Sequence, residues 1–179
     1  MRKLKNDELE RLSIEAYKTS RKTPIVLVLD NVRSMNNIGS AFRTGDAFRI
    51  EKVILTGITA QPPHRDIQKT ALGATESVDW EYYENSLEAI KTLKDQNYSI
   101  QAIEQAEAST SLERFTPKQE VKYALVFGNE VKGVSEEVMG AVDGCLEIPQ
   151  IGSKHSLNIS VSIGVVLWDF AQKLQVFEN

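Results

Sequence analysis

The chain has 179 residues, 41% of them hydrophobic and 26% charged, which is the composition of an ordinary globular protein that can bury one core. No run approaches the ~18 consecutive apolar residues of a membrane span, and the start of the chain lacks the apolar region of a secretory signal, so we expect a cytoplasmic protein without membrane association. Cys145 is the only cysteine, which excludes an internal disulfide, and with only His64 and His155 beside it we expect no metal site.

Charge is unevenly distributed along the chain, whose formal net charge is −4. Residues 1–24 carry seven basic and four acidic side chains, so the remainder is more acidic than the total. The net charge argues against a protein that coats nucleic acid generally, whereas a basic arm on an acidic body suits a protein that grips a polyanion at chosen places. A solvated amphipathic helix would carry the same charges, so both interpretations of the arm stay open.

The first half of the chain predicts helices and strands in alternation. Apolar residues at helical spacing indicate a helix over residues 7–19. The continuous apolar run PIVLVLD, residues 24–30, is typical of a strand buried on both faces of a parallel sheet. The asparagines of NNIGSAFRTGDAFRI can cap the helix that follows. EKVILTG predicts a second strand over 51–57, and residues 67–78 predict a short helix stopped by Gly73.

The second half continues the alternation and ends in a long apolar helix. The predicted elements are a strand at 79–84, a helix at 86–96 capped by Asn85 or Ser86, strands at 98–105 and 122–130 joined by a polar connection, a short helix at 135–142, a strand at 145–150 and the final helix. We therefore expect an α/β fold with a mostly parallel sheet flanked by helices. The final helix is apolar on almost every side and must be buried, which predicts a homodimer in a chain of this size.

Three polar loops follow predicted strands, and loops at the carboxyl ends of parallel strands converge where ligands bind. They are DNVRSMNNIGSAFR at 30–43, FGNEVKGVS at 127–135 and IPQIGSKHSLN at 148–158. Helix capping would account for Asn37 and for either Ser156 or Asn158. Capping does not account for Glu130 between two glycines, where the backbone can approach a ligand closely.

Several enzyme classes are disfavoured by these loops. They contain neither the G-x-x-x-x-G-K-[ST] spacing of a nucleotide triphosphatase nor the G-x-G-x-x-G spacing of a dinucleotide-binding dehydrogenase. The hypothesis of a hydrolase built from Ser156, His155 and Asp30 is weak. The chain has no G-x-S-x-G elbow, and His155 is poorly placed to act as the base for the adjacent Ser156.

Taken together, NNIGSAFRT, LVFGNEVKGVS and LEIPQIGSKHSLNISVSIGVVLW resemble the three motifs of the SpoU-type (TrmH) RNA ribose 2′-O-methyltransferases of the SPOUT superfamily. The motifs occur in the family's order between Pro24 and Leu174, with TALGATESV in the middle. The resemblance implies a SPOUT methyltransferase domain over 24–179, preceded by a basic helical extension at 1–23. It also implies a C-terminal deep trefoil knot, a homodimer through the knot region, S-adenosylmethionine as methyl donor, tRNA or rRNA as substrate, and no metal.

The resemblance also implies roles for individual residues. It places the adenine of the donor against the main chain at Gly128, Ile148 and Leu157. Its catalytic positions correspond here to Asn37, Arg43, Glu130, Ser156 and Asn158. Methyl transfer needs a ribose 2′-hydroxyl in line with the methyl group and stabilisation of the charge that develops as the proton leaves.

Arg43 is the residue that the resemblance places at the reacting hydroxyl. A guanidinium with a pKa above ~12 is a reluctant base, so we favour a hydrogen-bonding role that stabilises the developing alkoxide and engages the neighbouring phosphate. For Lys154 and His155 two interpretations stay open, contact with an RNA phosphate and simple exposure to solvent. We further expect a local positive track for RNA in or near the rim loops, formed by Arg33, Arg43, Arg49, Arg65, Lys69, Lys132 and Lys154.

Two alternatives to the enzyme remain at this point. One is a non-catalytic RNA-binding protein with the same knotted fold, which would be expected to have lost residues such as Arg43. The other is an unrelated small-molecule α/β enzyme, for which the three-motif match would be accidental.

Overall fold

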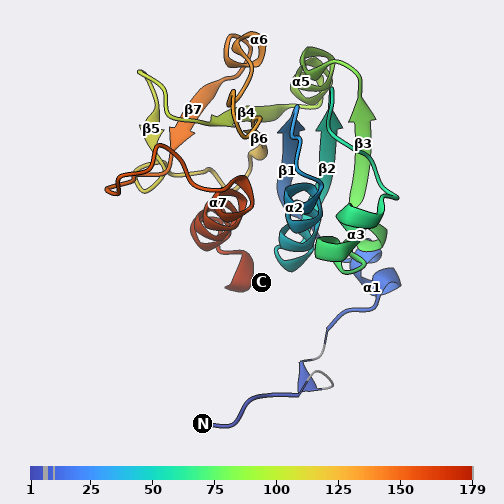
Figure 1. The fold of residues 1–179 in the computed structure, drawn as a ribbon. Helices are drawn as coiled ribbons and strands as arrows, with labels where there is room; N and C mark the ends of the chain where they lie inside the picture. The colour runs from blue at the N-terminus through green and yellow to red at the C-terminus, as the bar shows by residue number, and fades with distance from the viewer. Residues whose placement is uncertain (6–7, 10, 179) are drawn as a thin grey trace.

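A parallel sheet lies at the centre of the computed structural model, which describes residues 1–5, 8–9 and 11–178 (Figure 1). Within this part of the chain seven strands pair in the order β3-β2-β1-β6-β4-β7-β5, and each pairing is parallel. The strands are β1 (Thr23–Asp30), β2 (Ile50–Thr56), β3 (Asp79–Tyr83), β4 (Tyr98–Ile103), β5 (Thr110–Ser111), β6 (Lys122–Phe127) and β7 (Gly144–Glu147). The predicted α/β fold with a mostly parallel sheet is confirmed.

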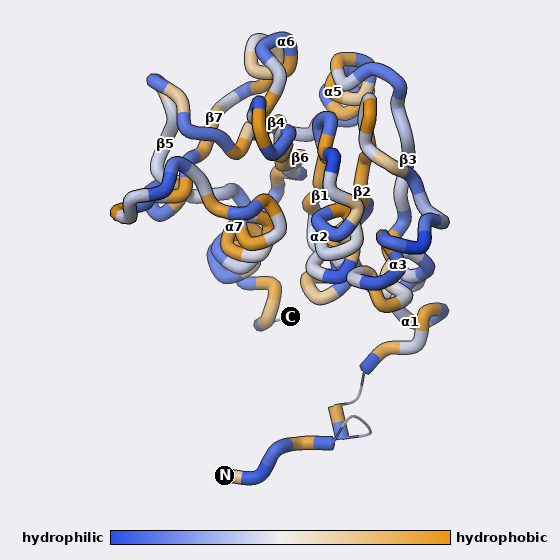
Figure 2. Tube along the Cα trace, viewed as in Figure 1, coloured by the Kyte–Doolittle hydropathy of each residue, from blue (hydrophilic) through white to orange (hydrophobic). Residues whose placement is uncertain are grey.

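Helices cover both faces of the sheet, and β1 shows why. Ile25, Leu27 and Leu29 pack into a core shared with one set of helices, whereas Val26 and Val28 face the other set. The first set is α2 (Met35–Ala47), α3 (Arg65–Ala71), α4 (Ala74–Ser77) and α7 (Ile159–Lys173), and the second is α5 (Ser86–Asp95) and α6 (Glu136–Met139). Two buried faces require an uninterrupted apolar strand, and Figure 2 shows this hydrophobic centre.

The strand order reverses between β1 and β6. The chain first lays β2 and β3 on one side of β1, and later lays β6 on the other side. Leu29 pairs with Phe127, so these neighbouring strands end together at their carboxyl ends. A crevice opens where strand order reverses in such a sheet, because the connections leave in opposite directions. The loops after β1 and β6 therefore meet at this edge.

The N-terminal helix is shorter than the prediction of residues 7–19. Helix α1 runs over Ile14–Thr19, and the side chain of Ser13 caps it by accepting a hydrogen bond from the N–H of Ala16. Residues 11–13 are not helical, and positions 7 and 10 lie outside the described residues. Tyr17 at the end of the predicted apolar stripe is buried in the core, whereas Leu12 is 51% exposed. Residues 11–13 therefore lack the core packing that a short helix needs in water.

Local hydrogen bonding corrects other predicted boundaries. Helix α2 is capped by Ser34 rather than by an asparagine, because the Ser34 hydroxyl accepts from the N–H of Asn37. The helix predicted over 67–78 is two helices, separated by Leu72 and Gly73 at positive φ. Five strands end one to three residues earlier than predicted, and the two-residue β5 was missed inside the polar connection.

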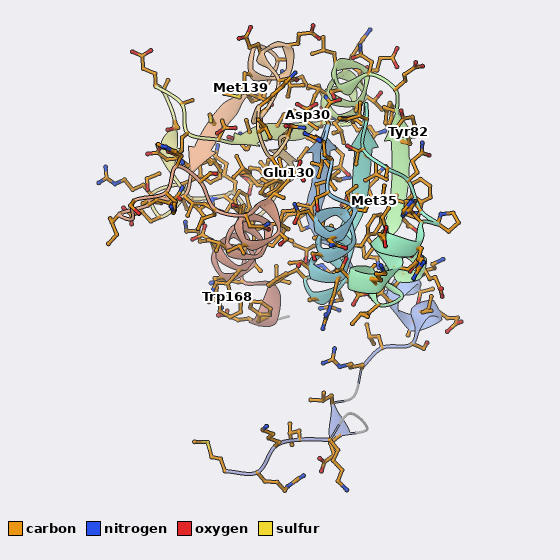
Figure 3. The ribbon with its side chains drawn as sticks, viewed as in Figure 1. Asp30, Met35, Tyr82, Glu130, Met139 and Trp168 are labelled. Carbon is orange, nitrogen blue, oxygen red and sulfur yellow. The ribbon has the colours of Figure 1, made fainter. Side chains whose placement is uncertain are left out.

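Helix α7 is only partly buried by the described chain. Asn158 is its N-cap, accepting from the N–H of Ser160, and Ile163, Val166 and Phe170 lie in the core. On the opposite face Val161, Val165 and Trp168 are 39–55% exposed, and Figure 3 shows Trp168 near the C-terminal end of the helix. Burial on every side is therefore not achieved within one copy of the chain. After α7 the chain forms a short 3-10 helix, η2 (Val176–Glu178).

Among the described residues, no helix combines the length and apolar character needed to cross a membrane.

Phe170→Ala should destabilise the protein by about 3–5 kcal/mol. The Phe170 ring is fully buried and packs against the rings of Phe115 and Tyr123, so the substitution leaves a cavity between α7 and the sheet. Urea denaturation measures the change in free energy of unfolding. Ile58→Ala, at a side chain 65% exposed, is the control and should change that free energy by less than about 0.5 kcal/mol. Equal effects of the two substitutions would contradict the assignment of this core.

Candidate active site

The loop after β6 closes on itself and approaches β4. Asn129 and Gly133 exchange backbone hydrogen bonds of 2.9 Å in both directions, and the Asn129 side chain accepts from the N–H groups of Val131 and Lys132. A Cβ atom on Gly128 would lie 2.0 Å from the carbonyl carbon of Gly133. The loop therefore needs glycine at position 128, where the main chain passes too closely for a side chain.

Glu104, the first residue after β4, fixes the far end of this loop. Its carboxylate accepts from the N–H of Val134 at 3.1 Å and from the N–H of Gln105 at 2.9 Å. Gly133 has φ of +70°, and a Cβ atom there would lie 2.2 Å from Glu104 Oε2. Glycine thus serves both the left-handed backbone and the space that the carboxylate occupies.

Glu130 joins the loop after β6 to the start of α2. Its carboxylate accepts three hydrogen bonds of 3.0 Å, from the N–H groups of Arg33 and Ser34 and from the side-chain amide of Asn37. Burial disfavours the charged form, but the bonds from Arg33, Asn37 and Ser34 outweigh it and lower the pKa of Glu130. The structure therefore brings Asn37 and Glu130 into direct contact, from positions 93 residues apart in the chain.

Asp30, the last residue of β1, connects the loop after β1 with the end of the loop after β6. Asp30 is 1% exposed. Its carboxylate accepts hydrogen bonds from the N–H of Ser135, the hydroxyl of Ser86 and the side-chain amide of Asn31. Asp30 is the last residue of β1, and Glu130 lies beside the start of α2, to which it is bonded (Figure 3). The carboxylate of Asp30 is thus buried and bonded to Ser135, Ser86 and Asn31, whereas His155 lies in the exposed third loop.

The third loop, residues 148–158, is the most exposed wall of the site. Residues 149–158 are exposed, including the whole stretch GSKHSLN. The loop is held at its middle by Gln105, whose side-chain Nε2 donates to the carbonyl of His155 at 2.7 Å, and at its end by the cap of Asn158 on α7. The main chain of His155 thus has a structural contact, and His155 lines the pocket described below, whereas Lys154 is exposed outside it.

A pocket of about 750 Å³ lies between the end of β4 and the loops that follow β6 and β7. It is lined by all three predicted donor-binding residues, Gly128, Ile148 and Leu157. Three of the predicted catalytic residues line it too, namely Glu130, Ser156 and Asn158. Asn37 joins the wall through Glu130, whereas Arg43 is exposed on α2 and does not line the pocket.

Among the residues of this pocket that lie outside the three predicted loops are Glu104 and Gln105, which sequence reasoning missed. The prediction extended β4 to residue 105, although the strand ends at Ile103. Read as strand residues, the two would alternate between the faces of the sheet and would not be expected at its edge. The available signal was a charged and an amide side chain directly after the strand-forming residues YSIQAI.

Arg49 does not lie near the rim loops: it directly precedes β2, at the amino ends of the strands, and lines a separate pocket with Arg21 and Lys22. The reason is that the connection from α2 returns to the start of the next strand. Groups of three or more His, Cys, Asp or Glu side chains placed to hold a metal ion are absent from the described chain.

Comparison with known proteins assigns the family. Residues 24–168 match the family model described as the SpoU rRNA Methylase family, which is most of the chain. This protein belongs to the SpoU rRNA methylase family. The match begins one residue after the start of β1 and ends within α7, so it contains the loops after β1, β6 and β7.

Relatives of this SpoU-family protein include named RNA methyltransferases. It is 30% identical over 166 residues to the tRNA (guanosine(18)-2′-O)-methyltransferase of Borreliella burgdorferi, covering 93% of this chain and 74% of that protein. It is 34% identical over 149 residues to the 23S rRNA (guanosine-2′-O-)-methyltransferase RlmB of Photorhabdus laumondii, covering 83% of this chain and 59% of the relative. The chain thus spans less than two thirds of the length of some curated relatives.

A solved structure confirms the fold. The TrmH/SpoU tRNA modifying enzyme of A. aeolicus superposes with a TM-score of 0.79 over 92% of this chain and 82% of that one, at 23% identity. At this level of identity the likeness supports the arrangement of strands and helices alone.

Gly133→Ala should lower stability by about 1–2 kcal/mol through the left-handed backbone, and more if the Glu104 carboxylate cannot move. Gly152→Ala is the matched control, since a Cβ atom there meets nothing within 4 Å. Thermal denaturation of the two variants should show a lower melting temperature for the first alone. Equal melting temperatures would mean that the loop is not held as described.

Glu130→Gln should remove a stabilisation that depends on pH. Because the pKa of Glu130 is lower in the folded state, its contribution is fully present above about pH 4.5, the ordinary value, and is lost as the pH falls through the folded-state pKa. The difference in melting temperature between wild type and variant should therefore be constant from about pH 7 to pH 5 and narrow toward pH 3. A difference that grows on acidification would contradict the hydrogen bonding described for this carboxylate.

Proposed function

We propose that this SpoU-family protein is an S-adenosylmethionine-dependent RNA methyltransferase that transfers a methyl group to a ribose 2′-hydroxyl of tRNA or rRNA. The observation that carries the proposal is one pocket at the carboxyl ends of the neighbouring strands β6, β4 and β7, where the three predicted donor-binding positions meet Glu130, Ser156 and Asn158. The names of the two curated relatives, each a guanosine 2′-O-methyltransferase, support the same reaction.

The donor would lie in the pocket with its adenine against main chain. Gly128 exposes peptide groups where a side chain is sterically excluded, and Ile148 and Leu157 supply apolar cover for the ring. Fixed peptide donors and acceptors can read the adenine edge, while apolar side chains bury its faces. No metal takes part in this scheme.

Arg43 would act at the receiving hydroxyl. In the described chain its exposed guanidinium makes no hydrogen bond or ion pair, so its five N–H donors are available to an RNA phosphate and to the alkoxide that forms as the hydroxyl loses its proton. Asn37 and Glu130 hold the start of the helix that carries Arg43, and through it they would set the position of the guanidinium. Ser156 and Asn158 would orient the RNA or the polar end of the donor from the opposite wall.

The knot and the dimer also belong to this proposal. The C-terminal segment is bonded to the connection between β4 and β6 at two separate points, Gln105 to the carbonyl of His155 and the Lys173 ammonium to the carbonyl of Leu112. These contacts support threading of the C-terminal segment through that connection. The exposed face of α7 borders an open apolar groove of about 570 Å³, lined in part by Val161 and Trp168, which a second copy would cover.

RNA would be bound by basic residues around the pocket and by the N-terminal segment. Lys132 and the exposed Arg33 belong to loops of the site, while residues 1–23 would form a basic extension to a methyltransferase domain over 24–179. Ribose methylation requires an exposed nucleotide, which loops of structured RNA present, and both tRNA and rRNA have such loops. We place the enzyme in the cytoplasm, consistent with its use of a single cysteine.

Methyl transfer from tritiated S-adenosylmethionine to total tRNA and, separately, to rRNA tests the function. Incorporation at a ribose of one of the two pools is the expected result, and nuclease mapping then names the nucleotide. Calorimetric titration with S-adenosylmethionine separates the alternatives. Donor binding without transfer would favour a non-catalytic RNA-binding protein, and a folded protein that binds no donor would exclude the methyltransferase.

Arg43→Ala should lower kcat for methyl transfer by about 100-fold or more, because the variant loses the cation at the developing alkoxide. Affinity for S-adenosylmethionine should change less than about twofold, since Arg43 does not line the donor pocket. Arg43→Lys should recover only part of the activity, because an ammonium lacks the planar fork. Lys91→Ala, which removes an exposed charge from α5, is the control. Full activity of a folded Arg43→Ala protein would refute the role.

A further inference from the structure

Glu104 lines the proposed donor pocket, and its carboxylate can accept more hydrogen bonds than the protein supplies. Each of its oxygens accepts one backbone hydrogen bond, Oε1 from Gln105 and Oε2 from Val134. A carboxylate offers about four lone-pair positions, so each oxygen retains room for a further donor. No ion pair involves Glu104 within the part of the chain that the structure describes. A carboxylate left this way inside a pocket calls for O–H or N–H donors from a ligand.

Several other polar side chains of the pocket are already bonded within the protein, and the rest lie in its exposed loops. Glu130 accepts from three groups of the α2 start. The Asn158 Oδ1 accepts from the N–H and the hydroxyl of Ser160, and Asn129 is bonded to its own loop and to the carbonyl of Asn31. Gln150 and Ser156 belong to the exposed third loop, whereas Glu104 directly follows a central strand and is held by main chain at both oxygens. Glu104 is therefore the pre-positioned acceptor of the pocket.

The position of Glu104 indicates which part of the donor it meets. It touches Gly133 and Val134, the end of the loop whose start, Gly128, faces the proposed adenine site. Ribose is the group bonded directly to adenine, and its 2′- and 3′-hydroxyls are two adjacent O–H donors. Two adjacent hydroxyls match two carboxylate oxygens with one free position each, as with the acidic residue that binds a ribose hydroxyl after a strand in dinucleotide-binding folds.

We propose that Glu104 binds the ribose diol of the methyl donor, a contact that adds side-chain recognition to the main-chain recognition of adenine. The inference rests on the proposed function, because it assumes that the donor occupies this pocket. The contact engages the ribose that the donor and its demethylated product share, so it sets affinity for both without distinguishing them.

Calorimetric titration of four protein–ligand pairs tests the contact. The ligands are S-adenosylhomocysteine and its 2′,3′-dideoxy analogue, and the proteins are wild type and Glu104→Gln. Wild type should bind the parent compound about tenfold or more tightly than the analogue, as expected for hydrogen bonds to a charged acceptor. Glu104→Gln should lose at least about tenfold for the parent and change little for the analogue. Glu107→Gln, at an exposed carboxylate of the same connection, should behave as wild type.

The four titrations distinguish direct contact from support of the loop. If Glu104 only held Val134, the variant would bind both ligands more weakly by the same factor, and the proposal would be overturned. If Glu104→Gln does not fold, as judged by circular dichroism, Glu104→Asp replaces it: it keeps the charge, shortens the reach, and should again affect the parent compound alone. Wild type that binds neither S-adenosylmethionine nor S-adenosylhomocysteine would refute the proposed function itself, whereas tight binding of the parent with equal losses in the variant would refute the diol contact only.

Discussion

The buried carboxylate of Asp30 is the constraint on which the carboxyl edge of the sheet depends. It ends the central strand β1 at 1% exposure and is bonded to the side chains of Asn31 and Ser86 and to the N–H of Ser135. A charge buried to this extent persists only where hydrogen bonds replace water. Its partners belong to three separate segments, so the loop after β1, the start of α5 and the end of the loop after β6 must all be in place together.

Carboxylates have the same task at two other points of this edge. Glu130 accepts from the start of α2, and Glu104 accepts from Val134 at the end of the loop after β6. Each carboxylate accepts from backbone N–H groups that no strand or helix pairs. Irregular backbone beside a sheet needs such acceptors, because an unpaired buried N–H group costs free energy. The site is consequently rich in fixed acidic groups although its proposed substrate is a polyanion. The cations that would meet RNA, such as Arg43, are exposed and outside this bonded frame.

The sequence predicts the central architecture well because burial imposes a periodicity on it. The apolar run ending at Asp30 predicts a strand covered on both faces, and the alternation of Ile25, Leu27 and Leu29 with Val26 and Val28 between two cores is the physical reason. The prediction is wrong where a competing local interaction decides. Ser34 outcompetes the asparagines as the cap of α2, and residues before Ile14 have no core to hold a helix.

The candidate site could be predicted only where its residues form a motif. The family motifs predict that Gly128, Ile148 and Leu157 share one binding site, and all three residues line the pocket. Glu104 belongs to none of the motifs, and its relation to Gly133 depends on β4 and β6 being neighbours, although 29 residues separate the two positions. That adjacency follows from strand order, which local patterns along one chain do not encode.

The ends of the sheet determine how copies of this protein can associate. One edge strand, β5, has only two residues, and the other, β3, carries Asp79 and Glu81 along its short length. Short or charged edges resist the addition of foreign strands, which is the usual route from an open sheet to aggregation. With both edges blunted, the apolar face of α7 is left as the surface through which self-association would proceed, so contact between copies would join helices and leave the hydrogen bonding of the sheet closed.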